Sequence, residues 1–178
     1  MKIYIPTRGR ADDQVTLSFF PESLRKEVVL VIDSDEEHLY KDKYDCQFMV
    51  IPEDIKGIAK KRQYIHKHTD DKKIVMLDDD LRFYIRKSDN DWHLRYLEPD
   101  EYPALFGLLD VWLDDYAHVG VSAREGNNRV EKLAVENTRY MRVLGYNLDM
   151  FDGIELGRVQ VMEDFDINLQ LLRQGKPS

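Results

Sequence analysis

The sequence is poor in cysteine and has no long hydrophobic stretch. One cysteine in 178 residues excludes an intramolecular disulfide framework and any metal or iron–sulfur site built from several cysteines. No run of about eighteen apolar residues occurs, so no transmembrane helix is predicted. The N-terminus reaches Arg8 too early to contain the apolar region of a signal peptide. We therefore expect a cytoplasmic protein that does not contact a membrane.

Positive charge is also scarce. The chain has 26 lysines and arginines against 34 aspartates and glutamates, which gives a formal net charge of −8. This balance argues against a broad surface for a phosphate backbone, although it leaves room for a local basic groove. With 43% hydrophobic residues, the chain reads as one globular domain over residues 1–178. A chain of this length buries roughly 70% of its unfolded surface and needs no structural metal to fold.

Short apolar runs alternate with helical patterns over residues 1–80. The predicted strands are Lys2–Pro6, Val28–Ile32, Gln47–Ile51 and Lys73–Leu77. The predicted helices are Gln14–Phe20, a segment opened by the capping box Ser34-x-x-Glu37, and Gly57–His68. This βαβαβαβ order predicts an α/β domain with a Rossmann-like, mostly parallel sheet and helices on both faces.

Residues 81–178 are less regular, and we expect a small β-rich extension there. The segments 81–86 and 93–97 predict a hairpin, and Asp100–Tyr116 predicts a long amphipathic helix. Further segments with strand or helix patterns are Val119–Ser122, Thr138–Val143, the strand-like Arg158–Met162, and the helix Asp164–Gln174.

Polar clusters follow three of the four predicted strands. They are Thr7-Arg8-Gly9-Arg10, Asp33-Ser34-Asp35 and Asp78-Asp79-Asp80. Ligands of open α/β sheets bind outside the carboxyl ends of the strands. The sequence therefore predicts one site built by three loops that are distant along the chain.

The three adjacent aspartates are the most informative of these clusters. Three neighbouring carboxylates repel one another, and a divalent cation such as Mg²⁺ or Mn²⁺ would neutralise them. In an extended chain Asp78 and Asp80 point the same way and Asp79 points the other way. Asp78 and Asp80 are therefore predicted to share a ligand. The alternative is a solvated acidic turn without a metal.

Cationic and acidic residues elsewhere add weaker signals. The guanidinium groups of Arg8 and Arg10 suit phosphate, and Gly57 opens a helix whose N-terminus favours anions. The three side chains of Lys60-Lys61-Arg62 cannot all face one ligand, since successive residues of a helix are rotated by about 100° around its axis. At the start of the last helix, Glu163-Asp164 can supply a general base, although ordinary acidic capping of the helix is the alternative.

Taken in order, these motifs resemble the GT-A glycosyltransferases, and within them the family-2-like group. The more specific resemblance is to the TET-associated glycosyltransferases of phages, which are predicted to glycosylate hydroxymethylated pyrimidines in DNA. The resemblance covers nearly the whole chain. The motifs that carry it are Ile5-Pro6-Thr7-Arg8-Gly9-Arg10, Gly57-Ile58-Ala59-Lys60-Lys61-Arg62-Gln63, Leu77-Asp78-Asp79-Asp80-Leu81, Gly120-Val121-Ser122-x-Arg124-x-Gly126-Asn127-Asn128-Arg129 and Glu163-Asp164-Phe165-Asp166.

The resemblance implies a metal-dependent glycosyltransferase that uses a nucleotide-sugar donor, with a UDP-sugar favoured. Residues 1–80 would form the nucleotide-binding half and residues 81–178 the acceptor-side half. Asp80, with Asp78, would hold Mn²⁺ or Mg²⁺, and Asp164 would be the base of an inverting reaction. The implied donor-binding residues are Pro6, Thr7, Arg8, Asp33, Gly57, Arg62, Asp78 and Asp79. The implied acceptor-binding residues are Arg124, Asn127, Asn128 and Arg129.

Two features depart from the family pattern. Gln63 stands where family-2 enzymes usually have asparagine, and the chain ends where many GT-A enzymes continue to a further metal-ligand histidine. A C-terminally shortened domain with weaker metal binding is therefore an expectation. Three alternatives stay open: a nucleotidyltransferase of the same fold, a non-catalytic nucleotide-binding module, and an acceptor other than DNA. If a phage encodes the protein, we expect it in the host cytoplasm.

Overall fold

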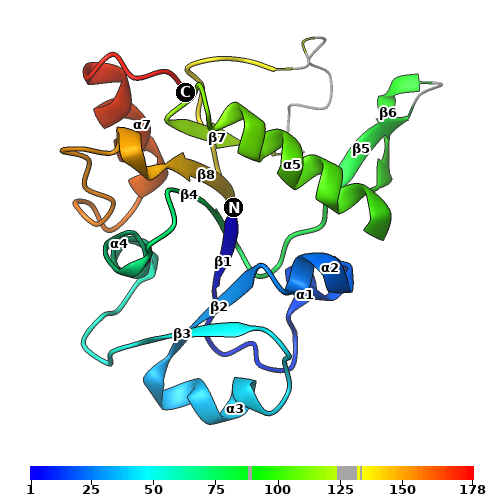
Figure 1. Ribbon diagram of the computed structural model, residues 1–178, viewed down its shortest axis with the longest axis vertical. Coiled ribbons are helices and arrows are strands. Elements are labelled where there is room, and N and C mark those ends of the chain that lie inside the picture. The colour runs from blue at the N-terminus through cyan, green and yellow to red at the C-terminus, as the bar shows by residue number, and fades with distance from the viewer. Residues whose placement is uncertain (88–89, 124–131, 133) are drawn as a thin grey trace.

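The molecule is organised around one six-stranded sheet with the strand order β3-β2-β1-β4-β8-β7 (Figure 1). The computed structural model describes residues 1–87, 90–123, 132 and 134–178. Strands β1 to β4 run parallel, whereas β8 is antiparallel to both of its neighbours. The predicted mostly parallel sheet is confirmed. The strands are β1 (Lys2–Pro6), β2 (Val28–Asp33), β3 (Gln47–Ile51), β4 (Lys73–Leu77), β7 (His118–Gly120) and β8 (Val143–Asn147).

Helices cover both faces of this sheet. One face carries α4 and α7, and the other carries α1, α2 and α5 (Figure 1). A separate hairpin of β5 (Tyr84–Lys87) and β6 (Asn90–Tyr96) projects away from the main sheet. In the described parts of the chain, no helix is both long and apolar enough to cross a membrane. The helices are α1 (Val15–Phe19), α2 (Glu22–Arg25), α3 (Glu37–Lys41), α4 (Ile58–His68), α5 (Tyr102–Trp112) and α7 (Glu163–Arg173).

The alternation of side chains along the strands divides the core into two layers. On β1, Ile3 and Ile5 pack toward α1 and α5, while Tyr4 packs toward α4 and α7. All six residues of β2 are buried, because this strand lies inside the sheet and is covered on both faces. Both layers hold the sheet rigidly, so the loops at its carboxyl edge start from fixed positions.

Some predicted elements are wrong. The capping box at Ser34 is absent: a short 3₁₀ turn, Ser34–Glu36, starts there without a side-chain cap, and α3 follows it. Residues 138–142 form no strand, and β8 begins only at Val143. The strand predicted at residues 158–162 is also absent: these residues are irregular, and the Val161 side chain is 78% exposed, whereas a strand of this sheet would bury it.

Candidate functional site

The loops after β1, β2 and β4 meet in one cleft, as the sequence predicts. The cleft has a volume of about 590 Å³ and also includes the start of α4. Arg62 does not line the cleft, but it forms an ion pair with Asp78, which does. Every other residue predicted to bind the donor lines the cleft. The lining residues are Pro6, Thr7, Arg8, Arg10, Asp33, Lys56, Gly57, Ile58, Lys61, Asp78, Asp79 and Asp80.

Two glycines shape the backbone of the cleft. Gly9 and Gly57 have φ angles of +67° and +88°, a region that side chains rarely tolerate. At Gly9 this turn aims the backbone N–H at the carboxylate of Glu36, with a nitrogen–oxygen distance of 2.8 Å. Gly57 is the residue from which the chain turns into α4. The first loop is thereby attached to the second, and the helix starts at the edge of the cleft.

Asp33, at the end of β2, is almost completely buried and is held by two cations. Arg8 bonds one of its carboxylate oxygens, and the Lys61 ammonium lies 2.6 Å from the other. Lys61 also donates to the backbone oxygen of Thr7, at 3.3 Å. Burial lowers the pKa of Lys61, and the nearby charge of Arg8 lowers it further. Sequence analysis missed this role because adjacent lysines on a helix look alike, and Lys60 is the exposed one.

The acidic segment does not remain extended, so the predicted alternation of its side chains is wrong. The chain turns at Asp79 and Asp80. One guanidinium nitrogen of Arg10, Nη1, lies 3.1 Å from Asp79 Oδ1 and 3.2 Å from Asp80 Oδ2. The Thr7 hydroxyl donates to the other oxygen of Asp79, at 2.6 Å. Asp79 and Asp80 therefore converge on one positive atom, and Asp78 takes a different direction.

A buried threonine on α1 fixes this turn from below. The Thr16 hydroxyl donates to the backbone oxygen of Asp78, at 2.7 Å, and accepts from the N–H of Leu81, at 2.8 Å. Its own N–H donates to the backbone oxygen of Asp79. Nothing in the local sequence marks Thr16, because its partners are more than sixty positions away.

Asp78 belongs to an ion-pair chain that reaches the last helix. Arg62 of α4 bonds Glu163 through Nη1, and its Nη2 lies 3.3 Å from Asp78 Oδ1. Arg62 and Glu163 are both buried. Burial raises the pKa of Asp78; the charge of Arg62 opposes this rise and that of Asp80 adds to it. Of the two acidic residues that open α7, Glu163 is thus occupied by an arginine.

Asp164, the predicted base, lies in the first turn of α7 beside this chain. It is not among the residues that line the cleft. Its carboxylate is 3.7 Å from Nε of Arg139, and that guanidinium packs over the ring of Phe165 at 4.0 Å. The predicted acceptor residues Arg124, Asn127, Asn128 and Arg129 lie outside the described residues.

The cleft has the chemistry of a divalent cation site with few protein ligands. Among the described residues, no group of three or more acidic, histidine or cysteine side chains converges as a ready metal cage. Two carboxylates nevertheless share one positive atom, so their oxygens already face a common point. Mg²⁺ and Mn²⁺ sites of this kind use one or two carboxylates and complete the shell with substrate phosphates and water. Asp79 and Asp80 fit that requirement.

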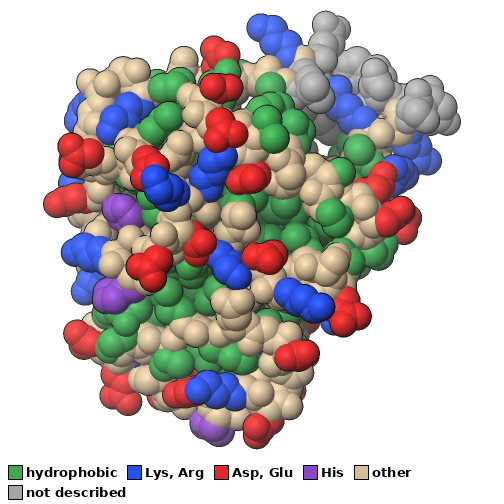
Figure 2. All heavy atoms as spheres, viewed as in Figure 1, with side chains coloured by type: hydrophobic (Ala, Val, Ile, Leu, Met, Phe, Trp, Pro, Cys, Tyr) green, Lys and Arg blue, Asp and Glu red, His purple; other side chains and the backbone are tan. Residues whose placement is uncertain are grey.

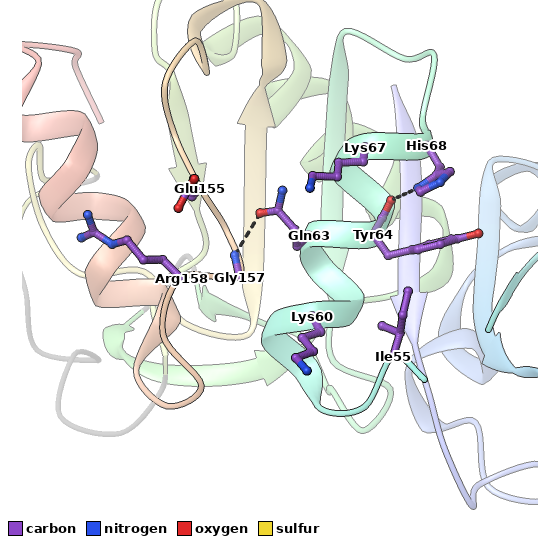
Figure 3. A pocket seen from close by; sticks show the side chains of 9 residues that line it. All are labelled: Ile55, Lys60, Gln63, Tyr64, Lys67, His68, Glu155, Gly157 and Arg158. Carbon is purple, nitrogen blue, oxygen red and sulfur yellow. Dashed lines mark hydrogen bonds between the residues drawn. The ribbon is translucent and has the colours of Figure 1, made fainter. Parts of the chain in front are cut away.

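A second hollow, of about 470 Å³, lies over the outer side of α4 (Figure 3). Gln63 points across it, and its side-chain oxygen accepts hydrogen bonds from the N–H groups of Leu156 and Gly157, at 2.7 and 3.0 Å. Glu155 is the acidic residue in its lining, so it lacks the converging carboxylates of the first cleft. The glutamine that departs from the family pattern therefore tethers a loop.

Charges of both signs are mixed over the face of the molecule drawn in Figure 2. Among the described residues of this face, basic and acidic side chains are interspersed. This distribution agrees with the net charge of −8.

A profile of the TET-associated glycosyltransferase family matches residues 1–177. No curated protein matches the sequence. Among solved structures, S. aureus TarS 1–349 in complex with UDP superimposes with a TM-score of 0.56 at 15% identity, over 96% of this chain and 54% of that one. Mycobacterium tuberculosis glucosyl-3-phosphoglycerate synthase, in complex with Mn²⁺, UDP and phosphoglyceric acid, gives 0.59 at 10% identity, over 97% and 64%.

A third structure, a CMP:2-keto-3-deoxy-manno-octonic acid synthetase complexed with CTP, gives a TM-score of 0.52 at 9% identity, over 99% of this chain and 86% of that one. At these identities the similarity establishes the fold, which is that of GT-A glycosyltransferases. The chain spans less than two thirds of the TarS fragment and of the mycobacterial synthase.

Proposed function

Because the chain belongs to the TET-associated glycosyltransferase family, we propose that it moves a sugar from a nucleotide-sugar donor to a hydroxyl group, with a divalent metal. The observation that carries the proposal is the cleft at the ends of β1, β2 and β4, which gathers seven of the eight predicted donor residues. UDP, present in the TarS and mycobacterial synthase structures, is the donor nucleotide we favour. Mn²⁺, present in the latter, is the favoured metal.

The residues of the cleft divide into two groups by position. At its deep end, Thr7 and Asp33 would hold the base and ribose, and Arg62 would keep Asp78 directed at the same nucleotide. Nearer the surface, Arg8 would contact the diphosphate. Asp80 remains the proposed principal metal ligand, and the shared contact to Arg10 makes Asp79 its nearer companion. The metal would stabilise the charge that develops on the leaving diphosphate.

For the acceptor side we propose that Asp164 is the general base. It would take the proton of the acceptor hydroxyl while that oxygen bonds to the anomeric carbon and the bond from that carbon to the diphosphate breaks. A direct displacement of this kind inverts the anomeric centre. Asp164 suits the role because its neighbour Glu163 is bonded to Arg62, whereas the contact of Asp164 with Arg139 is longer, at 3.7 Å.

The proposed acceptor is a hydroxymethylated pyrimidine in DNA, which the family membership favours. Arg124, Asn127, Asn128 and Arg129 are the proposed contacts, since amide and guanidinium groups can hold a base edge or a phosphate. The net charge of −8 disfavours a broad contact with the phosphate backbone. We therefore expect weak, strongly salt-dependent DNA binding.

The test offers the protein Mn²⁺, a UDP-sugar and a duplex that contains hydroxymethylcytosine. UDP-glucose and UDP-GlcNAc are tried in turn, and mass spectrometry of the DNA reports the transfer. We expect the mass of one sugar on this duplex and none on the same duplex with unmodified cytosine. Asp164→Asn should lower kcat by about 10²-fold or more while UDP still binds. The matched control is Asp166→Asn, on the same helix turn and paired with Arg158.

Two results would contradict the proposal. UDP binding without transfer to any hydroxyl acceptor would leave a nucleotide-binding module. Release of pyrophosphate from CTP in the presence of a sugar acid would favour the nucleotidyltransferase alternative, for which the CTP-bound synthetase of the same fold is the supporting observation.

A further inference from the structure

Arg10 holds the position between Asp79 and Asp80 at which the proposed metal would bind. Its Nη1 atom lies about equally far from both carboxylates, at 3.1 and 3.2 Å. We propose that Arg10 is the internal counter-ion of the metal-free site and that it transfers to the donor's diphosphate when metal and nucleotide bind together. This inference rests on the proposed function and adds to it an order of binding.

The first argument is electrostatic. Asp79 and Asp80 are adjacent in the chain, and their like charges destabilise the turn unless a cation lies between them. Arg10 supplies that cation, and its side chain is 41% exposed. The exposed pair of Arg10 with Asp80 contributes little net stability because water replaces each partner at low cost. Asp79 is 13% exposed and keeps the Thr7 hydroxyl as a partner. A divalent cation, with twice the charge, can therefore displace the guanidinium.

The second argument is that the exchange needs only a rotation of the Arg10 side chain. The backbone of Arg10 is fixed on both sides: its N–H donates to the hydroxyl of Tyr40, at 3.1 Å, and its carbonyl accepts from Gln14, at 3.0 Å. Asp79 keeps its bond from Thr7 when the arginine leaves. The loop can thus stay in place while the guanidinium swings.

The third argument concerns where the displaced guanidinium goes. Arg10 lines the same cleft as Gly57 and Lys61, so after displacement it remains inside the space that the donor would fill. A guanidinium fork matches two phosphate oxygens, and its charge compensates the diphosphate. The donor thereby offers Arg10 a partner to replace the two carboxylates that it gives up.

The consequence is coupling between metal and nucleotide. A metal ion that arrives alone must compete with Arg10, so its apparent affinity equals its intrinsic affinity multiplied by the fraction of time that the carboxylates are free. A nucleoside diphosphate removes that competitor. Each ligand then raises the affinity for the other by the same factor.

The experiment measures MnCl₂ binding by calorimetry and by the electron paramagnetic resonance of free Mn²⁺, with and without UDP. In Arg10→Gln we expect Mn²⁺ alone to bind about tenfold more tightly than in the wild type, and UDP with Mn²⁺ to bind about tenfold less tightly. The two affinities are expected to change in opposite directions. This matters because a structural defect would weaken both the binding of Mn²⁺ alone and the binding of UDP with Mn²⁺. Without Arg10 the carboxylates of Asp79 and Asp80 repel each other, so Arg10→Gln should unfold at a slightly lower temperature than the wild type; the shift should be small because the arginine side chain is 41% exposed.

Two further variants complete the design. Lys72→Gln removes the same charge from an exposed pair with Asp149 at the opposite end of β4, and should bind both ligands like the wild type. Arg10→Lys keeps the charge but loses the fork. It should bind Mn²⁺ alone as weakly as the wild type and should still bind the UDP–Mn²⁺ pair less tightly.

The outcomes separate this inference from the proposed function. If the wild type binds UDP with Mn²⁺ but Arg10→Gln binds Mn²⁺ alone no more tightly, the counter-ion role of Arg10 is overturned and the proposed function stands. If the wild type binds no UDP with Mn²⁺ while it remains folded, the proposed function fails and the role of Arg10 fails with it.

Discussion

The ion pairs beneath the cleft and those at its rim are built from the same residue types but differ in exposure. Lys61, in the wall of the cleft, and Arg62, beneath it, are 6% and 5% exposed. At the rim, the side chains of Arg8 and Arg10 are 47% and 41% exposed. A buried charge that loses its partner is left without solvation, whereas an exposed one regains water. The buried pairs therefore fix the frame of the site, and the pair of Arg8 belongs with them because its partner Asp33 is 1% exposed. The pair of Arg10 with Asp80, which is 51% exposed, is the one that a ligand can replace.

The largest effect should come from breaking a buried pair. Arg62→Met leaves the carboxylate of Glu163 buried without its partner, and we expect a loss of about 3–5 kcal/mol in the free energy of unfolding. Urea unfolding followed by circular dichroism measures it. Lys60→Met, two positions earlier on the same helix with an exposed side chain, is the matched control and should change stability by no more than about 0.5 kcal/mol.

A second substitution sharpens this result. Glu163→Gln in the Arg62→Met background replaces the unpaired buried carboxylate by a neutral amide, which is less costly to bury. The double variant should therefore be more stable than Arg62→Met alone. Equal or lower stability would show that Arg62 acts through packing, and the distinction drawn between the two sets of pairs would then fail.

A smaller effect is expected where the frame depends on a neutral hydrogen bond. Thr16 is completely buried, and Thr16→Val would leave the N–H of Leu81 and the carbonyl of Asp78 without a partner. We expect a loss of about 1–3 kcal/mol in the same unfolding measurement. Thr16→Ser keeps the hydroxyl and should be the more stable variant. The reverse order would mean that the methyl group matters more than the bonds to the acidic turn.

The smallest effect should be a change in pH dependence at Asp78. Its pKa is raised in the folded state, so the folded protein holds this proton where the unfolded chain has lost it. Its contribution to stability therefore falls as pH rises from its unfolded pKa to its folded one, and is constant above that. Asp78→Asn has no carboxyl group to titrate at this position. Its free energy of unfolding relative to the wild type should therefore rise between the unfolded and the folded pKa of Asp78. Unfolding at a series of pH values, from acidic to neutral, measures the difference; a flat difference would contradict the raised pKa.

Strands β1, β2 and β4 could be predicted because they are buried along nearly their whole length and therefore read as continuous apolar runs. Strand β8 could not be predicted in this way. It contains Gly145 and Asn147, which resemble turn residues in the sequence. Gly145 is required because a Cβ there would lie 2.8 Å from the side chain of Val119, and the Asn147 amide donates to the backbone oxygen of Leu113, at 2.7 Å. Both reasons depend on segments that are distant along the chain.

The same limit applies to the candidate site. The strand-end clusters identified the loops that form the cleft, because the carboxyl ends of parallel strands share one edge. The pairing within the cleft was not predictable. Whether Arg10 meets Asp79 and Asp80, or Arg62 meets Glu163, depends on how tightly the chain turns after β4 and on where α7 docks.

The position of β8 in the sheet also has a consequence for synthesis of the chain. This strand lies between β4 and β7, yet it is made after both of them. While a ribosome is still producing residues 121–147, β4 has an open edge and β7 has no partner in the sheet. An open edge is a template for pairing with other chains. The edge of β4 is therefore open to pairing with other chains until β8 inserts, and that interval ends only when residue 147 has left the ribosome.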